Sequence, residues 1–191
     1  MPPWAMAIVG YLLGSIPTGV IVARARGIDL RKVGSGNIGA TNVARALGRK
    51  MGVLVLLLDA IKGLVAVLVA SRLGTNGPWL AGVGFAAVVG HIFPVWLKLR
   101  GGKGAATSVG VLIGLVPVAG AAAGLTYLTV YAKTRTSSLG SLSGAIAALI
   151  AAPFATASRE LLALVVVMFV TIVLSHRENI RRLARGQENR V

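Results

Sequence analysis

A glycine-rich polar stretch, residues 34–42, has residue types that can bind an anion. Gly34, Gly36 and Gly39 allow the backbone to turn sharply and to approach a ligand closely. Consecutive backbone N–H groups in such a turn, leading into a helix, form an anion-binding concavity. An ordinary glycine-rich turn beside a membrane is the alternative, and no Gly-Lys-Ser/Thr follows at the spacing of a Walker loop. The candidate anion-binding residues are Ser35, Gly36, Asn37, Gly39 and Thr41.

Two basic residues from distant parts of the chain are candidates for holding phosphate groups. Arg45 follows the glycine-rich stretch, and Lys103 lies in the run Gly101-Gly102-Lys103-Gly104. Arg is a fixed cation with planar donors, whereas Lys is a compact point charge. The polar stretches around them contain almost no carboxylate, so they offer donors without acceptors. We expect the two cations to hold two phosphates, or one phosphate and a reacting centre.

The two histidines lie at the ends of apolar runs. His91 is most simply explained as a hydrogen-bonded histidine at a helix end. His176 precedes Asn179 by three residues, so on a helix the two share a face, and we favour a substrate contact there. Ser141 can supply a hydroxyl from another helix start, with a helix N-cap as the alternative.

The composition is that of a helical membrane protein. The chain has 191 residues, of which 55% are hydrophobic and only 13% charged. We predict one all-α polytopic domain over residues 1–191. The chain has no cysteine, two histidines and five acidic residues, so neither a metal nor another cofactor is expected.

The net charge of +15 comes from basic clusters that lie between apolar runs. This placement favours membrane lipids and phosphorylated substrates as partners, not nucleic acid. In the tail, Arg177, Arg181 and Arg185 repeat every four residues, which predicts a helix lying on anionic headgroups.

We predict about seven transmembrane helices, some of them short or broken. Pro17 interrupts the first, and Pro117 divides a long apolar stretch into a hairpin; without that hairpin there are six spans. Seven spans place the N-terminus outside, the C-terminus in the cytoplasm and seventeen of the twenty basic residues on the cytoplasmic side. Short, broken segments often mark a site inside the bundle. The segments are residues 4–23, 51–70, 78–97, 105–116, 118–132, 138–152 and 160–175.

Asp59 and Lys62 lie inside the second span, three residues apart, so they share a helix face and can pair. Charges inside a membrane are costly and usually face the bundle interior. A structural ion pair and a substrate contact both fit.

Together these polar stretches resemble the acyl-phosphate-dependent glycerol-3-phosphate acyltransferases of bacteria, the PlsY family. Each stretch alone is a weak signal, but the combination is specific and extends from the first span to the tail. The matching stretches are Gly14–Gly19, Gly34–Arg45, Asp59–Gly63, Gly90–Pro94, Gly101–Gly104 and His176–Leu183, with Gly186 and Glu188.

The resemblance implies a multi-pass enzyme of the bacterial inner membrane with its active site toward the cytoplasm. It would move an acyl group from acyl phosphate to the sn-1 hydroxyl of glycerol 3-phosphate in the first step of phospholipid synthesis, releasing lysophosphatidic acid and phosphate. The His-x4-Asp motif of soluble-type acyltransferases is absent, because Trp96 follows His91 by five residues and Arg181 follows His176.

On that basis we assign the donor phosphate to the residues of the glycine-rich turn listed above. Arg45, Lys103 and Asn179 would hold the glycerol phosphate, and Ser141 and His176 would contact its hydroxyls. The proton of the attacking hydroxyl goes either to His176 or to the substrate's own phosphate. Attack by Ser35 through an acyl-enzyme ranks last, because no base is adjacent in sequence.

The competing class is a transporter or channel for a phosphorylated metabolite, since broken helices and a cationic pocket fit it too. Polar access from both faces is required for transport, yet the connections at residues 71–77 and 155–159 are short and carry one basic residue each. A purely structural lipid-binding protein is a third and weaker interpretation.

Overall fold

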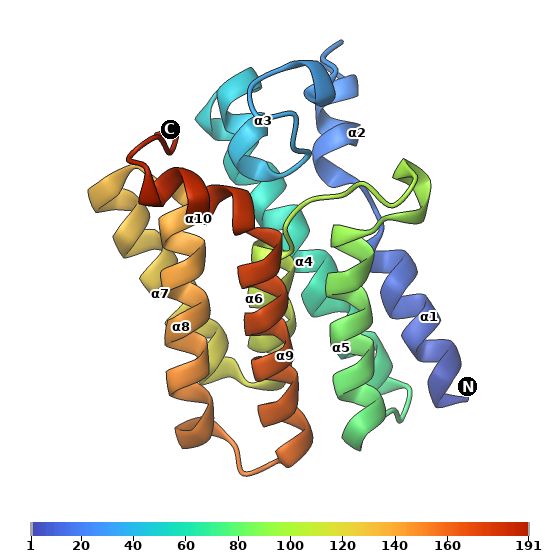
Figure 1. Cartoon of the computed structure of the whole chain (residues 1–191). Coiled ribbons are helices and arrows are strands. Elements are labelled where there is room, and N and C mark those ends of the chain that lie inside the picture. The colour runs from blue at the N-terminus through green and yellow to red at the C-terminus, as the bar shows by residue number, and fades with distance from the viewer. Residues whose placement is uncertain (1, 191) are drawn as a thin grey trace.

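The computed structural model describes residues 2–190, and every regular element within that range is a helix (Figure 1). Long helices run side by side, and short ones cover one end of the bundle. The elements are α1 (Pro3–Gly14), α2 (Thr18–Arg24), η1 (Leu30–Lys32), α3 (Ala40–Leu47), α4 (Arg49–Arg72), α5 (Gly77–Ile92), η2 (Val95–Leu97), α6 (Ala105–Leu115), α7 (Pro117–Thr134), α8 (Ser137–Ala155), α9 (Arg159–Ser175) and α10 (Arg177–Ala184).

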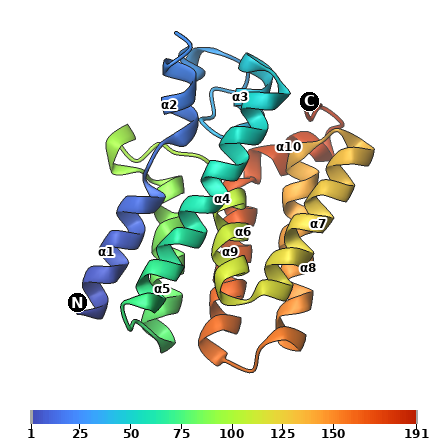
Figure 2. The ribbon, with the colours of Figure 1, turned by 180° about the vertical axis from the view of Figure 1, so that it is seen from behind.

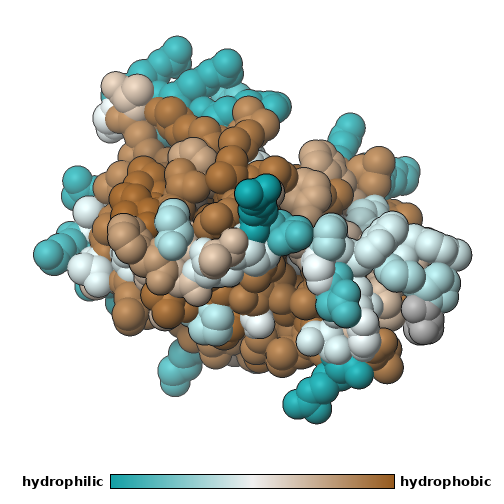
Figure 3. Space-filling view, turned by 90° about the horizontal axis from the view of Figure 1, so that it is seen from below, coloured by the Kyte–Doolittle hydropathy of each residue, from teal (hydrophilic) through white to brown (hydrophobic). Residues whose placement is uncertain are grey.

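Four helical spans are long and apolar enough to cross a membrane, or five if the bent pair α9 and α10 counts as one span. They are residues 3–24, 49–72, 77–97 and 137–155. Exposed apolar side chains cover the outside of the bundle, as expected of a surface in contact with lipid. Viewed from below, apolar residues cover much of the surface, near-neutral residues cover one side, and most strongly hydrophilic side chains lie at the edges (Figure 3).

The break in the first span occurs at Pro17, as its sequence predicts. The chain leaves α1 after Gly14 and resumes a helix at Thr18. Proline donates no backbone hydrogen bond, so carbonyl groups of α1 lose their helical partners. Lys62 Nζ donates a 2.8 Å hydrogen bond to Ile16 O, a carbonyl group in the break between α1 and α2. A buried lysine thus stabilises the kink.

Asp59 and Lys62 form the expected ion pair, with 2.8 Å between Oδ1 and Nζ. The same Asp59 oxygen accepts a 2.6 Å hydrogen bond from Thr18 Oγ1 and lies 3.4 Å from His91 Nδ1. These residues come from α2, α4 and α5. The buried cluster therefore connects three helices at the depth where α1 and α2 separate.

Glycines let α4 and α6 approach each other closely. A Cβ atom on Gly110 of α6 would lie 1.8 Å from Ala60 O of α4, and one on Gly63 would lie 2.3 Å from Thr107 O. Such contacts replace the hydrophobic effect as the main packing force inside a membrane. A cavity lies between α4, α6, α7, α8 and α9.

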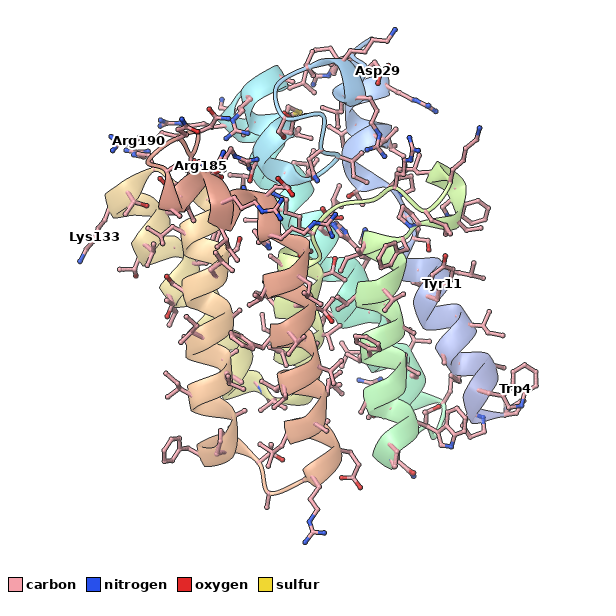
Figure 4. All side chains as sticks on the ribbon, viewed as in Figure 1. Trp4, Tyr11, Asp29, Lys133, Arg185 and Arg190 are labelled. Atoms are coloured by element: carbon pink, nitrogen blue, oxygen red, sulfur yellow. The ribbon has the colours of Figure 1, made fainter. Side chains whose placement is uncertain are left out.

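The polar segments lie at one end of the bundle. The two opposite views place α2, α3, α10 and the C-terminus at that end, and the N-terminus at the other (Figures 1 and 2). Asp29, Lys133, Arg185 and Arg190 lie there as well, far from Trp4 (Figure 4). The predicted tail helix is confirmed as α10, bent by 60° from α9. The glycine-rich stretch, residues 98–104 and the tail thus meet at one face.

Candidate active site

Asn42 organises the glycine-rich loop. Its side chain is buried, with 1% of the residue exposed. Asn42 Nδ2 contacts the carbonyl oxygens of Leu30, Val33 and Asn37 at 3.1, 3.0 and 2.8 Å, and its Oδ1 accepts a 2.9 Å hydrogen bond from Ser35 N. One amide therefore holds the loop in place from the first turns of α3.

The loop does not form the expected cradle of free backbone N–H groups. Ser35 N donates to Asn42, Gly36 N donates to Val33 O at 3.0 Å, and Gly39 N donates to Asn37 Oδ1 at 2.8 Å. The prediction was wrong for these N–H groups because the side chains of Asn42 and Asn37 and the carbonyl oxygen of Val33 accept them. The N–H groups of Ala40 and Thr41, the first two of α3, have no partner among the described residues. The N-cap of this helix is Gly39, which has no side chain to accept them.

Gly36 is the candidate residue that does not line the site. It has a positive φ of 67°, and its carbonyl oxygen faces Arg31 Nη1 at 3.5 Å. We interpret its role as conformational, because a left-handed backbone favours glycine.

Lys103, Asn179 and Glu188 form one network. Lys103 Nζ donates to Asn179 Oδ1, and Asn179 Nδ2 donates a 2.5 Å hydrogen bond to Glu188 Oε1. Arg182 Nε donates to the other carboxylate oxygen at 2.7 Å. The expectation of donors without acceptors was wrong at this point, because the tail brings the Glu188 carboxylate into the donor cluster.

The titration of this network follows from its burial. Burial lowers the pKa of the Lys103 ammonium to about 8, although Glu188 opposes that shift. Burial alone would raise the pKa of Glu188, but hydrogen bonds from Arg182, Asn179 and Ser138 outweigh it and hold that pKa below its usual value. Lys103 therefore carries its charge at neutral pH and begins to lose it in mildly alkaline solution.

The loop that carries Lys103 is attached to the end of α5. Gly101 N donates to Ile92 O at 2.9 Å, and Gly102 N donates to His91 O at 3.0 Å. A Cβ atom on Gly102 would lie 2.1 Å from His91 Nε2, so no larger residue fits against that ring. His91 therefore supports the loop through its carbonyl oxygen and its ring. Its buried Nδ1, 3.4 Å from Asp59 Oδ1, has no hydrogen-bond partner among the described residues, in contrast to the expected hydrogen-bonded histidine.

His176 follows the last residue of α9 and is 3% exposed. Its Nδ1 lies 2.8 Å from Ile172 O, and a carbonyl oxygen can only accept, so the proton is on Nδ1 and Nε2 is an acceptor. Burial, together with the positive charge of Lys103, lowers the pKa of His176 to about 4. The imidazole is neutral at physiological pH.

The predicted residues meet around one cavity of about 490 Å³. Its polar end lies under the tail, and its walls continue between the helices as an apolar surface that includes Leu112, Ala148 and Met168. Of the sequence-predicted residues, those that line it are Ser35, Asn37, Gly39, Thr41, Arg45, Lys103, Ser141, His176 and Asn179.

Ser141 lines the cavity, but its hydroxyl donates a 3.0 Å hydrogen bond to Ser137 O within α8. Ser137 and Ser138 make the contacts with other elements. Ser137 Oγ lies 2.7 Å from Thr41 Oγ1, and Ser138 Oγ donates to Glu188 Oε1 at 2.8 Å. Neither Ser137 nor Ser138 was among the sequence-predicted site residues, because a serine at a helix start is usually a cap.

Comparisons with known proteins identify the family of this chain. The family model "Glycerol-3-phosphate acyltransferase" matches residues 4–186. The chain is 52% identical over 188 residues to a glycerol-3-phosphate acyltransferase of Myxococcus xanthus, covering 97% of this chain and 98% of that protein. It is 48% identical over 189 residues to one of Geobacter sulfurreducens, covering 97% and 95%.

Two solved structures of PlsY, an integral membrane glycerol 3-phosphate acyltransferase, are also similar. The glycerol 3-phosphate form has a TM-score of 0.94 and 41% identity, covering 100% of this chain and 96% of that one. The lysophosphatidic acid form has a TM-score of 0.91 and 39% identity, covering 100% and 95%. The chain belongs to the glycerol-3-phosphate acyltransferase family.

Proposed function

We propose that this protein transfers a fatty acyl group from acyl phosphate to the sn-1 hydroxyl of glycerol 3-phosphate. The hydroxyl oxygen attacks the acyl carbonyl carbon, the bond from that carbon to the phosphate oxygen breaks, and lysophosphatidic acid and inorganic phosphate leave. The observation that carries the proposal is the single cavity that joins a cluster of cations and hydroxyls to an apolar groove between helices.

The glycerol phosphate would bind where Lys103, Asn179 and Arg45 face the cavity. Arg45 Nη2 donates to Asn189 O at 3.3 Å and Lys103 Nζ donates to Asn179 Oδ1, so both cations contact the tail. A phosphate placed between them would accept charge-assisted hydrogen bonds from both. Glu188 would orient Asn179 and Arg182 around it.

The donor phosphate would bind beside Ser35, Asn37 and Thr41, at the start of α3. The open N–H groups of that helix end and its positive dipole favour an anion. The loop glycines would bring the chain close to the phosphate, and Asn42 would keep the arrangement rigid. With both anions held together, much of the barrier is removed by orientation and charge stabilisation.

His176 would accept a hydrogen bond from the attacking hydroxyl through Nε2. Its low pKa makes it a weak base, so we assign the proton to the phosphate group of the donor, which leaves as phosphate. Ser141 would contact a second hydroxyl. An acyl-enzyme at Ser35 stays the least favoured route, since no base contacts that hydroxyl among the described residues.

We also propose seven spans in one domain of the bacterial inner membrane, with the site toward the cytoplasm. In support, α6 and α7 are separated by Val116 alone, and a Cβ atom on Gly120 would lie 2.5 Å from Ile113 N, so α7 folds back on α6. The excess of basic residues at the end that carries the tail agrees with this orientation.

Phosphate release by purified protein in proteoliposomes tests the function. We expect release from acyl phosphate to depend on added glycerol 3-phosphate and to disappear in Lys103→Ala, while Lys133→Ala, at the exposed end of α7, retains it. Uptake of glycerol 3-phosphate into sealed vesicles without phosphate release from acyl phosphate would indicate a transporter and reject the proposal.

A further inference from the structure

A second pocket lies at the same end of the molecule, apart from the active site. It has a volume of about 470 Å³, and none of its lining residues lines the larger cavity. It lies between the end of α2, the η1 turn and the segment after η2. Its lining residues are Val20, Arg24, Ile28, Asp29, Leu30, Arg31, Leu97, Lys98 and Arg100.

The pocket is strongly cationic. Four of its side chains are basic, and its one carboxylate, Asp29, accepts a 3.0 Å hydrogen bond from Arg31 N as the cap of η1. Within residues 2–190, none of Arg24, Lys98 and Arg100 belongs to an ion pair. A concave surface with three unpaired cations is suited to a phosphate group.

The backbone that presents these cations is held in an unusual conformation. Lys98 and Leu99 have φ values of 52° and 61°, a left-handed pair in which neither residue is glycine. Such residues persist only where surrounding contacts enforce them. Leu99 N donates to Pro94 O at 3.1 Å, and the Arg31 guanidinium donates to Arg100 O. The wall of the pocket is thus built by specific contacts.

Exposed apolar side chains adjoin the basic ones. Trp96 is 61% exposed and Leu99 is 55% exposed, on the same short segment as Lys98. Tryptophan is enriched at the level of lipid headgroups, where its ring contacts both the headgroup and the chains. A ligand with a phosphate and long apolar chains matches both parts of this surface, whereas a small soluble anion matches only the pocket.

We propose that this pocket binds the phosphate group of an anionic phospholipid whose acyl chains lie against Trp96 and Leu99. The site is separate from the catalytic one. Arg31 also faces Gly36 O at 3.5 Å, so the bound lipid would lie against the loop that holds the donor substrate.

Quenching of Trp96 fluorescence by brominated lipids tests this proposal. The chain has three tryptophans, and Trp4 and Trp79 begin α1 and α5 at the opposite end, so Trp4→Phe with Trp79→Phe leaves one reporter. In mixed vesicles we expect brominated phosphatidylglycerol to quench Trp96 with an apparent affinity about fivefold or more above that of brominated phosphatidylcholine.

The paired variant Arg24→Gln/Lys98→Gln should reduce that preference to about one, by the loss of two charges. The matched control Lys50→Gln/Lys133→Gln removes two exposed charges from the same end and should keep it. Thermal unfolding of both paired variants checks that they are folded. If Arg24→Gln/Lys98→Gln folds poorly, the single variants Arg24→Gln and Arg100→Gln take its place, and each should lose part of the lipid preference.

Three outcomes would overturn the proposal: equal quenching by the two lipids, a preference that survives Arg24→Gln/Lys98→Gln, or an equal loss in the control pair. Excess inorganic phosphate, at ionic strength matched with chloride, separates the two sources of phosphate. No change in quenching supports a lipid, and displacement as complete as that by unbrominated phosphatidylglycerol would show a soluble anion site instead.

Discussion

Ser138 Oγ donates a 2.8 Å hydrogen bond to Glu188 Oε1, which joins α8 to the tail beside the mouth of the cavity. The same carboxylate accepts from Asn179 and Arg182. Its side chain is 7% exposed. Glu188, fifty positions after Ser138 in the sequence, therefore aligns the donors that face the proposed phosphate site.

Replacing Glu188 by Ala should lower the free energy of unfolding by about 2–3 kcal/mol, because three donors lose a shared acceptor. Thermal unfolding in detergent measures the change. Glu178→Ala is the control: Glu178 pairs with Arg181 at 2.9 Å and is 58% exposed, so its loss should cost about 0.5 kcal/mol or less. Equal costs for the two variants would contradict the role of Glu188.

The kcat/KM for glycerol 3-phosphate should decrease as pH rises through about 8. The pKa of Lys103 is lowered to about 8, so the free enzyme loses this cation above that pH and keeps it below. Lys103→Arg should remove that alkaline limb, since guanidinium does not titrate there. Lys133→Arg should leave the profile unchanged, and an alkaline limb that persists in Lys103→Arg would assign it to another group.

His176→Ala should lower kcat/KM by about tenfold, the effect of one lost hydrogen bond to substrate. A general base would contribute about 10²–10⁴-fold. With a His176 pKa of about 4, the histidine as base would also produce an acid limb near that pH, which the variant would lose. Steady-state rates across the pH range separate the two roles, and a loss beyond about a hundredfold together with loss of the limb would reinstate the base.

Asn42→Ala should destabilise the glycine-rich loop and raise the KM for acyl phosphate. The four contacts of the buried side chain would be lost, at a cost of about 2–3 kcal/mol. Asn76 precedes α5 at the opposite end and makes no side-chain cap hydrogen bond, so Asn76→Ala is the matched control. A KM for acyl phosphate that stays unchanged in Asn42→Ala would show that the loop does not bind the donor.

Ala148→Leu should shift the preference of the enzyme toward shorter acyl phosphates. Ala148 is 3% exposed and lines the apolar part of the cavity, so a larger side chain there occupies volume that the acyl chain would fill. Rates with long and short acyl phosphates measure the shift. Ile150→Leu on the lipid-facing side of α8 should leave the ratio of those rates unchanged, and an unchanged ratio in Ala148→Leu would place the acyl chain elsewhere.

Much of the architecture could be predicted because hydropathy, proline and charge act locally along the chain. The apolar runs became helices near their predicted bounds, and the pairing of Asp59 with Lys62 followed from helical spacing. Arg45, Lys103 and His176 could be predicted as site residues from their types and from their positions in or beside the polar stretches between apolar runs.

The internal contacts of the site were decided by tertiary structure. Nothing in the local sequence shows that Asn42 takes the N–H of Ser35, or that Glu188 and not a bound anion satisfies Ser138 and Asn179. Local patterns specify which groups a segment carries, whereas the partner of each group depends on which distant helices pack together. Composition and periodicity determined a helical membrane protein with cationic polar segments; the packing of α3, α8, α9 and the tail determined which of their donors stay free to meet a substrate.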